Sequence, residues 1–345
     1  MKQKRIWVGA AIVVFLVLLG EYYVYRLKSA NLPEQPMTQI PMLGFVGGPV
    51  ADAKAELSGL AWFGDNLILL PQYPSVFRQN NEDGFLFYIP KAEILTYLAG
   101  KDKSPLLPRP IQLIAPGLAE EIPNYQGFEA IGFNGTQIFL TIEAGSNADD
   151  MQGYLISGSI AADLSTLTLD TTKLTKIDPQ AHSNNHTDES LLVLKDKVIT
   201  FYEVNGVGII PKPVAHVFGF DLQPQGTIPM KNLEYRLTDT ALGTGDTFWG
   251  INYFFPGDLD LLPKTDPIKD KYGTGKTHSL HPQVERLVEF KYSDSGITLV
   301  DTPPILLTLY DDARNWEGLV RLDNRGFLMV TDKFPTTILG FVPTP

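Results

Sequence analysis

The sequence contains no cysteine, which excludes disulfide bonds, thiolate metal ligands and a cysteine nucleophile. Histidine is scarce, with 5 residues in 345, which disfavours a zinc site built from imidazoles. Basic residues are in the minority: 28 Lys and Arg stand against 39 Asp and Glu, and the net charge is −11. Binding to nucleic-acid phosphates needs a basic surface, so nucleic acid is not expected as a partner.

The chain also lacks an apolar run of the length that usually spans a membrane. The longest such run, Ile6 to Gly20, has 15 residues, whereas a spanning helix needs about 20. Basic residues precede it and a tyrosine-rich segment, 21–25, follows it, as at the interfaces of a membrane anchor. No small-residue cleavage site follows it. The tyrosine-rich segment could carry the short run through the far interface, so we predict an uncleaved N-terminal transmembrane helix that anchors the chain within residues 1–28, with cleavage as the alternative. The rest is expected outside the cytoplasm, on the periplasmic or extracellular face.

The remainder is rich in residues that form turns and strands. It follows a segment at 29–37, which contains Asn31, Pro33 and Pro36 and is predicted to be a linker. The whole chain holds 30 Gly, 26 Pro, 14 Tyr and 19 Phe, which suits many short strands better than long helices. We therefore expect one all-β domain over residues 38–345.

A hairpin pattern recurs five times in this domain. Each copy has two apolar strands around a tight turn, and polar residues flank it 14 positions apart in four copies and 15 in the fifth. Further strand-like segments between the copies give each unit about four strands, as in a propeller blade. This predicts a five-bladed β-propeller closed by an N-terminal strand near 41–46, or a six-bladed one if 258–284 hides a degenerate blade. The copies are Ser58–Gln72, Glu129–Glu143, Glu189–Glu203, Asp239–Tyr253 and Glu317–Asp332.

Acidic residues begin four of the five hairpins. The first strand of each blade lines the central channel, so these four side chains are expected at one level near the axis. Like charges raise one another's pKa, so something must neutralise them, and carboxylate oxygens suit Ca²⁺ or Mg²⁺. Two alternatives are that the acids accept backbone N–H groups from the next blade, or that they form a solvated acidic funnel. The predicted metal ligands are Glu129, Glu189, Asp239 and Glu317.

Other polar residues are expected near the same mouth. Glu143 and Glu203 end their hairpins, and His186 lies in a loop that precedes a first strand; each is a candidate catalytic base, although a solvated loop histidine is the plainer interpretation of His186. Arg314 could bind an anionic group, or form a surface ion pair with a neighbouring aspartate. The predicted substrate contacts are Arg314, Asn252 and Asp332.

The best-formed repeat reads Glu317-Gly318-Leu319, then a turn at 323–326, then Asp332. Segments 58–62 and 127–131 follow the same pattern. The pattern resembles the repeats of secreted β-propellers of the phytase-like and SdiA-regulated-like type, and is related to that of calcium-dependent lactonases. The resemblance implies a propeller fold in which first-strand acids hold Ca²⁺ at the channel mouth. This chain departs from the family pattern in two blades: the first has Ser58 in place of the acid, and the fourth has no Glu-Gly-Leu sequence.

Three functions are compatible with these features. The first is a metal-dependent hydrolase of esters or phosphoesters, in which the metal polarises the substrate and Glu143, Glu203 or His186 activates water. The second is a non-catalytic, membrane-tethered binding or assembly module with a structural metal, whose ligand is a small molecule or an envelope component. The third is a propeller glycosidase that uses paired carboxyl groups.

Overall fold

The computed structural model describes residues 31–44, 55–80 and 82–345. Within these ranges no helix combines the length and apolar character needed to cross a membrane. The anchor predicted for residues 1–28 lies outside the described residues, as do positions 45 and 46 of the predicted closing strand.

The strands form antiparallel sheets in which each hairpin of the repeat supplies the two inner strands. The outer strands of the first two groups, β7 and β11, pair in parallel, so that these groups share one eight-stranded sheet. The first group is β4 (Leu57–Phe63), β5 (Asn66–Pro71), β6 (Gly84–Pro90) and β7 (Arg109–Ile114). The second is β8 (Tyr125–Asn134), β9 (Gln137–Ala144), β10 (Gln152–Ile160) and β11 (Thr166–Ile177).

The other three groups are separate sheets. The third is β12 (Asp188–Val193), β13 (Val198–Tyr202), β14 (Val214–Phe218) and β15 (Pro224–Pro229). The fourth is β16 (Arg236–Leu242), β17 (Thr247–Phe254), β19 (Val284–Ser293), β21 (Ile305–Leu307) and β2 (Glu34–Gln35), with β20 (Gly296–Leu299) beside β19. The fifth is β22 (Trp316–Leu322), β23 (Gly326–Thr331), β24 (Leu339–Pro343) and β3 (Thr38–Ile40).

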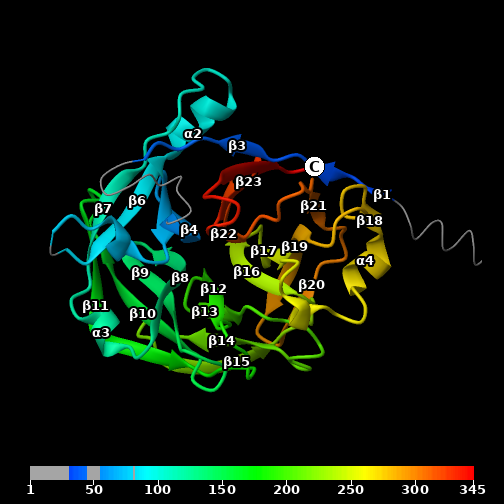
Figure 1. Ribbon diagram of the computed structural model, residues 1–345. Coiled ribbons are helices and arrows are strands. Elements are labelled where there is room, and N and C mark those ends of the chain that lie inside the picture. The colour runs from blue at the N-terminus through cyan, green and yellow to red at the C-terminus, as the bar shows by residue number, and fades with distance from the viewer. Residues whose placement is uncertain (1–30, 45–54, 81) are drawn as a thin grey trace, which may run out of the picture.

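The innermost strands close into a ring. Strand β4 packs beside β8, β8 beside β12, β12 beside β16, β16 beside β22, and β22 again beside β4. Figure 1 shows the sheets arranged around this common centre. Buried apolar side chains fill the space between neighbouring sheets; Ile68 and Ile138, for example, belong to the cluster that the first two groups share. The chain therefore has a β-propeller fold.

Hydroxyl groups of the inner strands also hold neighbouring sheets together. Ser58 Oγ donates to the carbonyl oxygen of Phe128 over 2.6 Å, and Thr238 Oγ1 donates to that of Trp316 over 2.6 Å. Each bond joins the innermost strands of two different groups.

The ring is closed by β3, which pairs antiparallel with β24 and lies just before the predicted position at 41–46. Ile40 is buried in the core beside Leu339, while Pro41, with no N–H to donate, ends the pairing. Within the predicted stretch, Met42 makes an isolated bridge to Leu106. Among the described residues, the strand that closes the ring is therefore β3.

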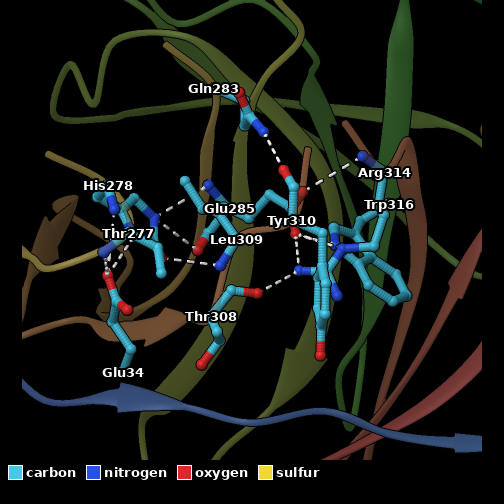
Figure 2. Close-up of polar contacts among 10 residues, drawn as sticks. All are labelled: Glu34, Thr277, His278, Gln283, Glu285, Thr308, Leu309, Tyr310, Arg314 and Trp316. Atoms are coloured by element: carbon cyan, nitrogen blue, oxygen red, sulfur yellow. Dashed lines mark hydrogen bonds and ion pairs between the residues drawn. The ribbon is translucent and has the colours of Figure 1, made fainter. Parts of the chain in front are cut away.

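Residues 31–35 do not form the free linker that the sequence suggested. β1 (Asn31–Leu32) pairs in parallel with β18 (Thr274–Gly275), and β2 pairs in parallel with β21. The Glu34 carboxylate fixes this segment, because Oε1 accepts the backbone N–H groups of Thr277 over 2.8 Å and His278 over 3.1 Å (Figure 2).

The long segment between β17 and β19 forms no further four-stranded sheet among the described residues. It contains η3 (Leu259–Leu261), α4 (Pro267–Tyr272) and β18. The other helical elements within the described ranges are η2 (Pro74–Phe77), α2 (Lys91–Leu98) and α3 (Leu118–Glu121).

Candidate functional site

A cavity of about 240 Å³ opens where the inner strands begin, at the end of the ring towards which the repeat's polar residues point. Loops from several blades complete its wall. Its lining residues are Glu56, Ser58, Gln72, Tyr73, Gln126, Glu129, Glu143, Asn185, Glu189, Arg236, Phe255, Asp258, Asn315, Glu317, Asp332, Lys333 and Phe334.

A β-bulge occurs at the same point of every innermost strand. The register of each strand with its partner slips across the residue that begins the repeat, so that this residue stays outside the regular ladder. A bulge of this kind bends the strand and re-aims the extra side chain. The residues at the bulges are Ser58, Glu129, Glu189, Asp239 and Glu317.

Three of the four acids at the bulges line the cavity: Glu129, Glu189 and Glu317. Asp239 does not line it. Its Oδ2 accepts the backbone N–H of Leu319 over 2.6 Å, and its Oδ1 accepts that of Thr240 over 2.7 Å. Asp239 therefore joins two inner strands, as in the alternative in which an acid accepts N–H groups from the next blade.

Burial and neighbouring charges favour the protonated form of the three cavity acids. Burial raises the pKa of Glu129 well above its usual range, and the nearby Glu143 carboxyl raises it further. Burial, followed by the charge of Glu203, likewise raises the pKa of both Glu189 and Glu317. Bound protons are therefore one way in which the charges of these groups can be neutralised.

The acids do not form a ready-made metal site. Across the described residues, no three His, Asp or Glu side chains converge closely enough to hold an ion. The oxygen chemistry of the wall suits Ca²⁺ or Mg²⁺, but the arrangement does not, so that a bound cation would require the carboxylates to reorient. The predicted metal therefore stays a prediction, and no chemical step is assigned to it.

Two further carboxyl groups, Glu143 and Asp332, line the same cavity. Glu143 accepts a hydrogen bond from Thr187 Oγ1 over 3.2 Å, and burial together with the charge of Glu203 raises the pKa of Glu143 to about 8. Asp332 accepts one from Asn315 Nδ2 over 3.2 Å, and burial raises the pKa of Asp332 to about 6. At pH 7 Glu143 is mainly protonated, while Asp332 is mainly ionised.

Glu203, a predicted base, is engaged in an ion pair. It is fully buried, and its Oε1 accepts a hydrogen bond from Arg236 Nη1. Arg236 also donates from Nε to Asp258 Oδ2 over 2.8 Å. Arg236 and Lys333 are the basic residues of the cavity lining. Arg236 uses its hydrogen-bond donors on Glu203 and Asp258.

His186 is not the solvated loop histidine of the plainer interpretation. It is 9% exposed, and its Nδ1 lies 2.7 Å from Ser183 Oγ. Its Nε2 faces Glu203 Oε2 at 3.8 Å. Burial lowers the pKa of His186, so that the imidazole is neutral at pH 7.

Two of the three predicted substrate contacts lie outside the cavity lining. Arg314 Nε donates to Glu285 Oε2 over 2.9 Å, and the guanidinium stacks on Tyr310 and Trp316 (Figure 2). Asn252 Nδ2 donates to the carbonyl oxygen of Glu234 over 2.9 Å. Both side chains are buried structural groups, and Arg314 pairs with Glu285 rather than with an adjacent aspartate.

Several residues of the wall were not among the predicted site residues. Gln72 Nε2 donates to Glu129 Oε1 over 2.9 Å. The close approach of Gln72 to β8 requires Gly127, where a Cβ would lie 2.6 Å from the Gln72 carbonyl oxygen. The rings of Phe255 and Phe334, from two different blades, lie 6.0 Å apart between centroids. Only the position of Gln72 at the end of the first hairpin could have pointed to this site.

No protein-family model and no curated protein matches the chain. Solved structures do resemble it. A glucose dehydrogenase aligns with 11% identity over 90% of this chain and 99% of its own, with a TM-score of 0.46. An exo-β-1,3-galactanase from Phanerochaete chrysosporium aligns with 8% identity over 89% of this chain and 64% of its own, with a TM-score of 0.50. A GH43 β-xylosidase/α-arabinofuranosidase from a compost metagenome gives 9% identity, 85% and 93% coverage and a TM-score of 0.43.

The closed ring of sheets defines the class as a β-propeller, and the similarity to the galactanase, with a TM-score of 0.50, agrees with that fold. At 8% identity this similarity bears on the fold alone. It does not support the more specific resemblance to phytase-like or SdiA-regulated-like propellers.

Proposed function

We propose that this protein is a hydrolase whose central cavity performs general acid–base catalysis on a glycoside. Glu143 is the acid and Asp332 the base. The observation that carries the proposal is that these two carboxyl groups line one cavity with pKa values of about 8 and about 6. Two carboxyl groups whose surroundings separate their pKa values can divide the roles of proton donor and proton acceptor.

The reaction then proceeds as a hydrolytic displacement. Asp332 takes a proton from a water molecule, whose oxygen attacks the anomeric carbon. The bond from that carbon to the leaving oxygen breaks, and Glu143 gives its proton to that oxygen. Asn315 and Thr187 orient Asp332 and Glu143 through their hydrogen bonds. The proton that Asp332 has gained returns through solvent to Glu143, which restores the starting state.

The chemistry of the wall favours a neutral, hydroxyl-rich substrate. Protonated carboxyl groups and side-chain amides both donate and accept hydrogen bonds with hydroxyl groups, and the aromatic rings can pack on the apolar face of a sugar. The acids of the lining would repel an anionic phosphoester. Arg236 and Lys333 are the basic residues of the lining that could offset this repulsion. The amides are Gln72, Gln126, Asn185 and Asn315, and the aromatic residues are Tyr73, Phe255 and Phe334.

We further infer that the propeller has five blades, because five inner strands of the described chain close the ring and each carries the same bulge. We also retain the proposal that residues 1–28 tether the propeller outside the cytoplasm. It rests on the basic flank, the apolar run and the tyrosine-rich segment of the sequence.

Ca²⁺ or Mg²⁺ is the alternative counter-charge for the cavity. It is favoured by the gathering of three buried acids, Glu129, Glu189 and Glu317, and opposed by the lack of convergent ligands among the described residues. A cation would serve a metal-dependent esterase or phosphoesterase, or a non-catalytic module with a structural metal.

The proposal is tested with a panel of p-nitrophenyl glycosides and phosphates. Turnover of a glycoside should fall by roughly 100-fold or more in Glu143→Gln and in Asp332→Asn. It should be unchanged in Glu120→Gln, an exposed acid outside the cavity. Turnover of phosphates alone would overturn the proposed substrate, and sugar binding without any turnover would show a binding module instead.

A further inference from the structure

A second group of reactive side chains lies beside the cavity, in the loop that precedes β12. Ser183 Oγ is 2.7 Å from His186 Nδ1, and His186 Nε2 faces Glu203 Oε2 at 3.8 Å. A hydroxyl, an imidazole and a carboxylate thus lie in series. Asn185, between the serine and the histidine in the sequence, lines the cavity, so the loop reaches its rim.

The triad requires one particular tautomer of the histidine. When the Ser183 hydroxyl donates to Nδ1, the ring proton of a neutral imidazole must reside on Nε2. That N–H points towards Glu203, as the orienting acid of a nucleophilic triad requires. The distance of 3.8 Å exceeds a hydrogen bond, and such contacts often shorten only when substrate binds.

Two buried atoms support this assignment independently. His186 Nε2 and Glu203 Oε2 are both buried and have no hydrogen-bond partner among the described residues. A buried polar atom without a partner costs about 1–3 kcal/mol, so two of them facing each other call for an explanation. Arg236 occupies only Oε1 of Glu203, which leaves Oε2 for the histidine.

The loop also offers donors for a developing oxyanion. Within the described chain, the backbone N–H groups of Asn184 and Asn185 donate to no acceptor. Asn185 has a left-handed backbone with φ of 58°, which marks a sharp turn next to the histidine. Unpaired N–H groups beside a nucleophile are the donors that an acyl-transfer intermediate needs.

We propose that Ser183, His186 and Glu203 form an acyl-transfer triad that hydrolyses small, uncharged carboxylic esters at the rim of the cavity. Ser183 Oγ bonds to the ester carbonyl carbon while its proton passes to His186 Nδ1. His186 gives that proton to the leaving alcohol as the ester C–O bond breaks. Water, deprotonated by His186, then attacks the acyl group and releases the acid and the serine. In this step Glu143 and Asp332 transfer no proton.

The first test is labelling of the full-length protein with a fluorophosphonate probe, followed by peptide mapping. One probe per chain should attach at Ser183, and labelling should be lost in Ser183→Ala and fall at least tenfold in His186→Gln. Ser295→Ala, at an exposed loop serine, should label as fully as the unaltered protein. No labelling, or labelling that survives His186→Gln, would overturn the proposal.

The absence of cysteine allows a second test that needs no ester. Ser183→Cys introduces the chain's single thiol. Beside His186 this thiol should form a thiolate and react with iodoacetamide at pH 6, whereas the matched Ser295→Cys should show the usual thiol pKa of about 8.5. The S183C/H186Q variant should lose the rapid reaction. Equal pH dependence of the two single thiols in folded protein would contradict the triad.

Discussion

Asp239 Oδ2 accepts the backbone N–H of Leu319 over 2.6 Å, and this bond joins the innermost strands of the fourth and fifth blades. The same carboxylate accepts the N–H of Thr240 through its other oxygen. One acid of the repeat therefore supports the ring, while its equivalents in three other blades face the cavity.

Asp239→Ala should destabilise the propeller without changing the cavity. It leaves the N–H groups of Leu319 and Thr240 without their acceptor, each at a cost of about 1–3 kcal/mol. Urea unfolding measures the loss in the free energy of unfolding. Asp312→Ala, at an exposed loop acid, is the matched control and should change that free energy little. An unchanged midpoint for Asp239→Ala would show that the bond is unimportant.

Arg314 should contribute to stability and not to substrate binding. Arg314→Met leaves the buried Glu285 carboxylate without its partner, which costs about 3–5 kcal/mol. KM for the glycoside substrate should stay the same in protein that remains folded. Arg325→Met, at an exposed position, should alter neither quantity. If KM rises and the free energy of unfolding stays the same, Arg314 contacts the substrate, as the sequence predicted.

The stability of the protein should depend on pH through Glu143. Its pKa is about 8 in the folded protein, against an ordinary value of 4.5, so the folded state binds the proton more tightly than the unfolded state. The resulting stability is complete below pH 4.5 and is lost as the pH rises towards 8. Glu143→Gln, which keeps the neutral shape, should therefore gain in melting temperature relative to the unaltered protein across this window. A difference that does not vary with pH would contradict the raised pKa.

Removal of calcium distinguishes two ways in which the charge of the cavity acids can be neutralised, by bound protons or by a metal ion. Since no preformed ligand set exists among the described residues, glycoside turnover should survive treatment with a chelator. The melting temperature should not rise when Ca²⁺ is restored. A rise that disappears in the double variant Glu129→Gln, Glu189→Gln would establish the metal alternative, because a ligand that binds only the folded state stabilises it.

The repeat allowed the fold and part of the site to be predicted from the sequence. The constant spacing between polar ends located the inner hairpins and the mouth at which Glu129 and Glu143 meet. The sequence could not show the bulges, because a shift in strand pairing at one residue does not change the order of apolar and polar residues in the strand. It could not show the burial of Arg314 or Asn252 either, since their partners, Glu285 and Arg286, lie on β19 outside the repeat. The roles of Ser183 and Gln72 depend on contacts between segments that no local pattern relates.

The pH profile of kcat/KM on a glycoside substrate tests the central claim most directly. The acid–base pair predicts a bell-shaped profile, with a rise near pH 6 as Asp332 ionises and a fall near pH 8 as Glu143 loses its proton. Glu143→Gln should lower the maximum by roughly 100-fold and remove the alkaline limb. A profile with the same two limbs in the Glu143→Gln variant would contradict the assignment of Glu143 as the acid.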